Sequence, residues 1–414
     1  MRNVRLFIST ICVLLSLPLM ALAQSTTSSD GGLSALARLS GNGVVVDSNW
    51  GGLDLTIEMT RPVPWRVFTL DQPRRLVIDF SELDWTGLDR EAVLYESDKI
   101  ADLRAGLYRP GWSRLVLDLN APFSVMQSEM RSDDGVTRMI LGLKSVSDDV
   151  FAQEAGVPEA VAAEQTILPV APVSTRQRGD GPLVVVLDPG HGGIDPGASR
   201  DGVVEADLML TFAKELRDVL LRSGGFEIVL TREEDHFVSL EERVLIARRA
   251  GADVFLSLHA DALAQGRATG ATVYTLSQEA SNVASEKLAE RHNRGDLLAG
   301  VDLSRHDDEV ALVLMDLART NNAPRSNALA DALVEGIHSA TGSIYKNPRL
   351  QAGFSVLKAA DIPSVLIELG FMSSPKDLAK MVSPDWRKDA ATGIRDALQY
   401  WAIQDAAQAD LLRK

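Results

Sequence analysis

Cysteine is nearly absent from this chain, whose 414 residues include a single one, Cys12. Cys12 lies within an N-terminal apolar segment that we expect to be cleaved off, so the mature chain would contain no thiol. This excludes disulfides, a cysteine-based zinc site and a cysteine nucleophile. The stability of the mature protein must then come from packing, with a metal ion as the other candidate.

Long apolar runs and an excess of basic residues are also missing. After the N-terminal segment, no stretch approaches the ~20 apolar residues that a membrane-spanning helix needs, so we expect no integral membrane protein. The chain has 42 Lys and Arg against 57 Asp and Glu, which gives a formal net charge of −15. This balance argues against a nucleic-acid partner, because such a partner favours a basic face.

The N-terminus reads "MRNVRLFISTICVLLSLPLMALAQ". Arg2 and Arg5 precede an apolar run that ends in Ala21-Leu22-Ala23, which is the pattern of a secretory signal and its cleavage site. We therefore predict a signal peptide over residues 1–23 and an exported protein. Residues 24–41 are rich in Ser, Thr, Gly and Ala, and we expect them to be disordered.

Short β-type runs broken by Pro, Gly and Asp fill residues 42–146, which predicts an all-β domain. Its two halves resemble each other, because each has a strand, then Pro with an aromatic residue (Pro64-Trp65, Pro122-Phe123), then another strand. Such a repeat favours a small sandwich of two related sheets, although chance similarity among short strands is an alternative. Residues 147–181 lose the alternation and are typical of an extended linker.

Strands alternate with helical patterns over residues 182–403. "LVVVLD" is a continuous apolar run, as in a strand buried on both faces, and "EADLMLTFAKELRDVLLRSG" places apolar residues on one helical stripe. "FEIVLT", "DVFLSLHAD", "ATVYTL", "FSVLK" and "PSVLIELGF" continue the series of strands. This predicts an α/β domain with a mostly parallel twisted sheet flanked by helices, followed by a C-terminal tail at 404–414.

A glycine-rich turn follows the first of these strands in "VVVLDPGHGGIDPGA", residues 184–198. A phosphate-binding loop would end in Gly-Lys-Ser/Thr, and a dinucleotide site would have a third glycine where Asp195 stands. A serine hydrolase would need Gly-x-Ser-x-Gly, but "GFSVL" lacks the last glycine. The turn therefore calls for another explanation.

Metal-competent side chains recur at one predicted edge of the sheet. His191 and His259 each follow a strand, and Glu205 opens the helix after the turn. Two histidines and a glutamate, with a fourth position left for water, are typical of hydrolytic zinc sites. Glu368 also ends an apolar strand, where a carboxyl of raised pKa suits proton transfer. Singly each residue fits a structural role better, but together the four indicate a hydrolytic metal site.

These residues resemble a known family. "VVVLDPGHGGIDPGA", Glu205, "LTREEDHFVSLEERVLIARRAGADVFLSLHAD" and "IPSVLIELGFMSS" look like the zinc-dependent N-acetylmuramoyl-L-alanine amidases of bacterial cell-wall remodelling. The resemblance implies one zinc ion held by His191, Glu205 and His259, and Glu368 as the catalytic acid/base. It also implies cleavage of the peptidoglycan amide between N-acetylmuramic acid and L-alanine. The strand-rich domain looks like the AMIN domain of the periplasmic cell-division amidases of Gram-negative bacteria, which implies a periplasmic, septal location.

Residues 277–325 form a helical insertion between strands that is longer than one crossover needs. In similar amidases such an insertion covers the active site until a LytM-type activator moves it aside, so we expect autoinhibition. Glu279, Glu286 and Glu290 share a helical face and are the candidates to block the zinc ion, although a solvated face is the alternative. Asp195 and Asp261 are candidates to orient the ligand imidazoles, or else to form a turn and cap a strand.

Two rival hypotheses stay open at this point. One is a non-catalytic peptidoglycan-binding protein on a degenerate amidase fold, which the presence of all four site residues disfavours. The other is a zinc peptidase or deacetylase acting on another cell-wall bond, although the sequence has no His-Glu-x-x-His helix. For the AMIN-like domain, septal targeting and a protein-binding platform are both compatible with the sequence.

Overall fold

The computed structural model describes residues 36–411, apart from gaps of which the longest are 159–176, 263–268 and 299–308. The predicted signal peptide, 1–23, lies outside the described residues. Within the part of the chain that is described, no helix is both long and apolar enough to cross a bilayer.

The N-terminal region is a sandwich of two antiparallel sheets. One sheet has the order β5 (Leu83–Asp84), β1 (Ala37–Asn49), β2 (Gly52–Met59), β9 (Val136–Ser145), β8 (Phe123–Asp133), with β5 parallel to β1 at its edge. The other has the order β3 (Trp65–Leu70), β4 (Arg75–Ser81), β7 (Trp112–Leu119), β6 (Ile100–Arg109). Buried side chains from both sheets, such as Leu55, Ile78 and Leu117, form one core. The predicted all-β fold is confirmed.

The two similar halves of the sequence have the same local arrangement in this sandwich. In the first half, β2 lies in one sheet, and after Pro64 the chain forms the β3–β4 hairpin of the other sheet. In the second half, β7 lies in that other sheet, and after Pro122 the chain returns to form the β8–β9 hairpin of the first. The Pro-aromatic pairs therefore mark the points where the chain changes sheets.

The domain extends beyond both ends expected from composition. Strand β1 begins at Ala37, so residues 37–41 are ordered sheet and not part of a disordered segment. Helix α2 (Asp148–Glu154) is capped by the Ser147 side chain and buries Phe151 in the sandwich core, so the start of the expected linker belongs to the domain. A short helix, α1 (Arg90–Tyr95), contributes Val93 to the same core.

The C-terminal region is built on a mixed sheet that is mostly parallel, as predicted. Its order is β13 (Phe226–Leu230), β10 (Leu183–Pro189), β14 (Val254–His259), β17 (Ser364–Glu368), β15 (Ala271–Leu276), β16 (Ile344–Ala352). Only the β15–β17 pair is antiparallel among these neighbours. Because β10, β14 and β17 run in the same direction, their carboxyl ends meet at one edge. Residues His259 and Glu368 are direct neighbours in the β14–β17 register.

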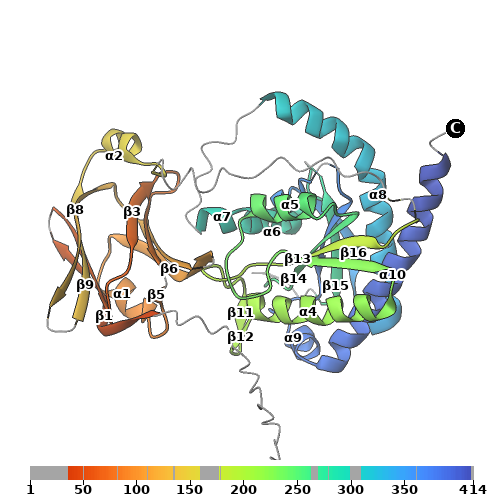
Figure 1. Cartoon of the computed structure of the whole chain (residues 1–414), viewed down its shortest axis with the longest axis horizontal. Helices are drawn as coiled ribbons and strands as arrows, with labels where there is room; N and C mark the ends of the chain where they lie inside the picture. Colours follow the sequence, from red (N-terminus) through yellow and green to blue (C-terminus); the bar gives the residue numbers. More distant parts are fainter. Residues whose placement is uncertain are drawn as a thin grey trace, which may run out of the picture. The chain divides into compact units, whose positions relative to one another are not determined.

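Helices cover both faces of this sheet (Figure 1). One face packs against α4 (Glu205–Ser223), α8 (Glu309–Thr341) and α10 (Pro384–Leu411). The other packs against α5 (Leu240–Arg249), α6 (Val283–Asn293) and the 3-10 turn η1 (Ser355–Leu357). Helix α4 buries Leu208, Phe212 and Leu216 as its sequence stripe predicts, and it ends at Gly224, whose φ is 72°.

Smaller elements lie near the sheet edge. They are the β11 (Ser199–Arg200) and β12 (Val203–Val204) hairpin, α7 (Gly295–Leu298) and α9 (Pro375–Met381). We expected "FSVLK" to be a strand, but it forms η1. The strand of the sheet is β16, which ends at Ala352, just before this segment. The end of the expected insertion and the crossover after it are one helix, α8, which continues through Pro324. Helix α10 runs to Leu411, so most of the expected tail is helical.

Candidate metal centre

The glycine-rich turn after β10 places His191 at the sheet edge. His191 has a φ of 60°, in the left-handed region that side chains rarely adopt. The glycines on either side allow close packing: a Cβ on Gly190 would lie 2.1 Å from Cε1 of His259, and one on Gly197 would lie 2.6 Å from Cδ2 of His191. The turn is therefore shaped to bring two imidazoles together.

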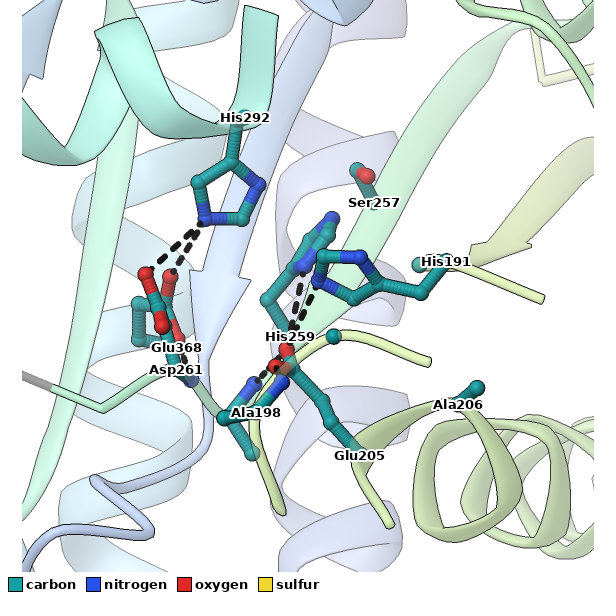
Figure 2. Close-up of polar contacts among 12 residues, drawn as sticks. His191, Ala198, Glu205, Ala206, Ser257, His259, Asp261, His292 and Glu368 are labelled. Atoms are coloured by element: carbon teal, nitrogen blue, oxygen red, sulfur yellow. Dashed lines mark hydrogen bonds and ion pairs between the residues drawn. The ribbon is translucent and has the colours of Figure 1, made fainter. Parts of the chain in front are cut away.

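Glu205, the first residue of α4, lies between these two imidazoles. Its Oε1 atom is 3.3 Å from Nε2 of His191 and 3.3 Å from Nδ1 of His259. Main-chain N–H groups hold the carboxylate, because Ala260 donates to Oε1 at 2.9 Å and Ala198 donates to Oε2 at 2.9 Å. Figure 2 shows the two rings directed at Glu205 from different segments. The structure thus brings His191, Glu205 and His259 together.

Glu368 lies beside this group at the end of β17. Its side chain is fully buried, and its Oε2 atom accepts a hydrogen bond from the N–H of Asp261 at 2.9 Å. Its Oε1 atom has no hydrogen-bond partner. The neighbouring strand positions of His259 and Glu368 explain why a carboxyl group faces the imidazoles here.

A third imidazole, which the sequence did not single out, comes from α6. His292 lies on the buried stripe of this helix with Ser285, Leu288 and Ala289. Its Nε2 atom is 3.6 Å from Oδ2 of Asp261 and 3.6 Å from Oε1 of Glu368 (Figure 2). Its ring centroid lies 4.2 Å from that of His259. The signal in the sequence was a histidine at the i+7 position of an otherwise apolar helical stripe.

The three glutamates expected to block the metal do not reach this cluster. Glu279, Glu286 and Glu290 are all exposed. Periodicity predicted a common helical face for them, but Glu279 precedes α6, and Glu286 and Glu290 face solvent because α6 packs through its Leu288 side. The residue that α6 directs at the site is His292, which corrects the expectation of a glutamate.

The two aspartates occupy different positions. Asp195 accepts a hydrogen bond from Nδ1 of His191 at 2.8 Å, so it orients that ring. Asp261 contacts neither His191 nor His259. Its Oδ1 atom accepts a hydrogen bond from Arg291 of α6 at 2.7 Å, and its Oδ2 atom faces His292. Asp261 therefore joins α6 to the edge of the sheet.

Burial and neighbouring charges shift the pKa values of the cluster strongly. Burial, followed by the proximity of His292, lowers the pKa of His259 to about 4. Burial opposes the ionisation of Glu205, but the adjacent His191 and His259 outweigh it and hold the pKa of Glu205 well below its usual range. A neutral imidazole and an ionised carboxylate are the forms that bind metal ions.

The pKa values of His191 and Glu368 lie well above their ordinary ranges. Burial disfavours the charged form of His191, yet the carboxylates of Asp195 and Glu205 outweigh burial and raise its pKa. For Glu368, burial is the main cause, and the charges of Asp261 and Glu205 add to it. A carboxyl group with a raised pKa can exchange protons near neutral pH.

The cluster fits a divalent cation. Donor atoms of His191, His259 and His292 all lie within 4.8 Å of one another. Buried Nε2 atoms of His191 and His292 have no hydrogen-bond partner, and neither do Oε1 of Glu368 and Oδ2 of Asp261. Imidazole and carboxylate donors together favour zinc among the common ions.

Comparisons with known proteins agree with this geometry. A family model described as N-acetylmuramoyl-L-alanine amidase matches residues 185–400, and one described as AMIN domain matches residues 43–145. N-acetylmuramoyl-L-alanine amidase AmiC of Neisseria meningitidis serogroup B is 32% identical over 364 residues, covering 83% of this chain and 86% of the relative.

Two relatives come from Escherichia coli. N-acetylmuramoyl-L-alanine amidase AmiC is 29% identical over 371 residues, covering 86% of this chain and 88% of the relative. N-acetylmuramoyl-L-alanine amidase AmiA is 38% identical over 224 residues, covering 54% of this chain and 77% of the relative. The similarity to both AmiC proteins extends over the sandwich as well as the α/β domain.

Proposed function

Because the chain belongs to the N-acetylmuramoyl-L-alanine amidase family, we propose that it hydrolyses the amide between N-acetylmuramic acid and L-alanine in peptidoglycan, in daughter-cell separation and cell-wall remodelling. One observation carries the proposal. His191, Glu205 and His259 meet at the sheet edge with the buried carboxyl of Glu368 beside them. A degenerate binding protein would have no need of this complete set.

His191, Glu205 and His259 are the residues that hold the metal, one zinc ion per catalytic domain. A zinc ion held by these residues would supply Lewis-acid chemistry for the amide carbonyl and would lower the pKa of the attacking water. Asp195 fixes the orientation of the His191 ring through its hydrogen bond to Nδ1. Main-chain donors at Ala198 and Ala260 hold the Glu205 carboxylate. These contacts preorganise the donor atoms before any ligand binds.

Glu368 moves the protons of the reaction. Its Oε2 atom is anchored by the N–H of Asp261, while its Oε1 atom has no hydrogen-bond partner and is free to accept a proton. It takes the proton of the attacking water and then delivers one to the nitrogen of the leaving L-alanine. Its raised pKa suits both directions of transfer.

Chelation is expected to abolish the activity. Mature protein incubated with purified peptidoglycan should release intact stem peptides, and a chelator should stop this release until zinc is added back. Mass spectrometry of the soluble products identifies the bond that is cut. Products with a free N-terminal L-alanine are required; cross-bridge fragments or released acetate would support the peptidase or deacetylase alternative instead.

Helix α6 holds the site closed in this proposal. Three protein ligands leave a position open for catalysis, whereas a fourth closes the coordination shell. His292 is the fourth donor. Polar contacts hold α6 in place. Arg291 donates a hydrogen bond to Asp261, and the Asn293 side chain donates one to the carbonyl of Gly353 and accepts one from the N–H of Ser355. A LytM-type activator protein that binds the helical insertion would draw His292 away.

In this proposal the enzyme acts in the periplasm, at the septum, where its peptidoglycan substrate lies. The signal-peptide pattern of residues 1–23 supports export. The AMIN domain, matched over residues 43–145, directs it to septal peptidoglycan. A fluorescent fusion lacking residues 36–158 is then expected to lose its septal enrichment in dividing cells. An unchanged distribution would favour the protein-binding alternative for this domain.

A further inference from the structure

We propose that Arg232 is a positioning residue of the metal centre, which sets the separation between His191 and Glu205. This inference rests on the proposed function, because it concerns the same site. Arg232 lies two residues after the end of β13 at Leu230, and its hydrogen bonds go to main-chain carbonyls and not to the metal-binding side chains. It acts instead on the main chain that carries two of them.

Arg232 bridges the two segments with one nitrogen atom. Its Nη2 atom donates to the carbonyl of Gly190 at 2.9 Å and to the carbonyl of Ala206 at 2.8 Å. Gly190 precedes His191, and Ala206 follows Glu205. The Nε atom of Arg232 also donates to the carbonyl of Pro189 at 3.0 Å. One guanidinium group therefore joins the glycine-rich turn to the first turn of α4.

Arg232 differs from two other arginines of the fold that bind carboxylates. Arg114 and Arg387 each form two hydrogen bonds to one carboxylate, that of Asp79 and that of Glu215. The guanidinium of Arg232 donates to main-chain carbonyls instead, including that of Glu234 at 3.3 Å. Buried Arg75 of the sandwich also donates to main-chain carbonyls, those of Pro73 and Asp71, but these lie within one turn. Arg232 instead joins two separate segments, and each of them carries a metal-binding residue.

A second arginine fixes the turn from its other side. Arg243 of α5 donates to Oδ1 of Asp188 at 2.6 Å and to the carbonyl of His191 at 2.8 Å. Asp188 in turn accepts a hydrogen bond from Ser257, two residues before His259, at 2.7 Å. Arg243 thus holds the turn against β14. Arg232 holds it against α4, so the two arginines set different distances within the ligand set.

The strained backbone of His191 gives Arg232 its importance. A residue with a φ of 60° stays in place only when its surroundings hold it there. Outer partners of metal ligands typically change metal affinity by about 10–100-fold when they are replaced. Lysine keeps the charge of Arg232 but has one donor nitrogen, so it cannot keep the Nε bond to Pro189 together with the Nη2 bonds to Gly190 and Ala206 in the same geometry. Arg232→Lys is therefore the informative substitution.

The test compares two arginine-to-lysine variants in the full mature chain. Arg232→Lys is expected to weaken zinc binding by about 10–100-fold, measured by competition with a chromophoric chelator. It should also change the visible absorption spectrum of the cobalt-substituted protein, which reports ligand geometry. Arg387→Lys is the matched control, because Arg387 also holds α4 but far along the helix at Glu215. It should lower the unfolding temperature and leave zinc affinity and the cobalt spectrum unchanged.

Each outcome decides the proposal. A folded Arg232→Lys variant with wild-type zinc affinity and spectrum overturns it. Arg232→Gln is prepared alongside; if both variants fail to fold at saturating zinc, Arg232 serves the fold and the proposal is also overturned. The proposed metal centre is tested separately by the wild type and His191→Ala: a wild-type protein that binds no zinc refutes the centre itself, whatever Arg232 does.

Discussion

Glu368→Gln is expected to slow hydrolysis of the muramoyl-alanine amide by about 10²–10⁴-fold, the usual contribution of a positioned acid/base group. Glutamine preserves the shape of the side chain and can still accept the hydrogen bond from Asp261. It cannot take up a proton from the attacking water. The effect should therefore fall on turnover and not on the fold or on metal content.

The measurement is the rate of stem-peptide release from peptidoglycan, with zinc content determined on the same samples. Glu227→Gln is the matched control, because Glu227 is an exposed glutamate on β13 of the same sheet. This control should hydrolyse at the wild-type rate. A Glu368→Gln variant that retains zinc and more than about a tenth of the wild-type rate would remove Glu368 from the mechanism.

His292→Ala is expected to raise the basal rate of hydrolysis in the absence of any activator. Without the imidazole, α6 loses its donor to the metal centre and its contacts with Asp261 and Glu368. A coupling of about 1–3 kcal/mol between helix docking and the site would give an increase of about 5–150-fold. The assay is peptidoglycan hydrolysis by the full mature chain, with and without an activator of the LytM type.

Controls on the same helix separate blocking from general destabilisation. Glu286→Ala and Glu290→Ala change exposed residues of α6 and should leave the basal rate unaltered. Deletion of residues 279–320 should raise the rate at least as much as His292→Ala does. If the folded deletion variant and His292→Ala both show unchanged or lower activity, α6 does not inhibit the enzyme.

Local patterns in the sequence determined the fold class and most of the site. Alternating and continuous apolar runs predicted a β-sandwich followed by a mostly parallel α/β sheet, and both are present. Parallel strands align their carboxyl ends, so polar residues that follow apolar runs meet at one edge. This is why His191, His259 and Glu368 could be grouped without a structure. Glu205 could be added to this group because it lies at the start of the helix that follows the glycine-rich turn.

Composition was a weaker guide to domain ends. Small residues around position 40 suggested disorder, yet this stretch is part of β1, because Ala37 and Arg38 pair with β5 and Leu39 pairs with β2. The segment after 147 reads as a linker, yet burial of Phe151 against the sandwich orders α2. In both places a tertiary contact outweighed the local preference of the residues. A short window of sequence contains no information about such a contact.

Only the tertiary structure decided which side chain of the insertion reaches the site and what holds the glycine-rich turn. Helical periodicity gave Glu279, Glu286 and Glu290 a common face but left its direction open. Helix α6 begins only after Glu279, and the packing of its Leu288 turns Glu286 and Glu290 to solvent and directs His292 inward. Arg232 reaches the carbonyls of Gly190 and Ala206 across 42 and 26 residues of chain. Contacts over such separations arise from how elements pack, because local periodicity sets only the faces within each element.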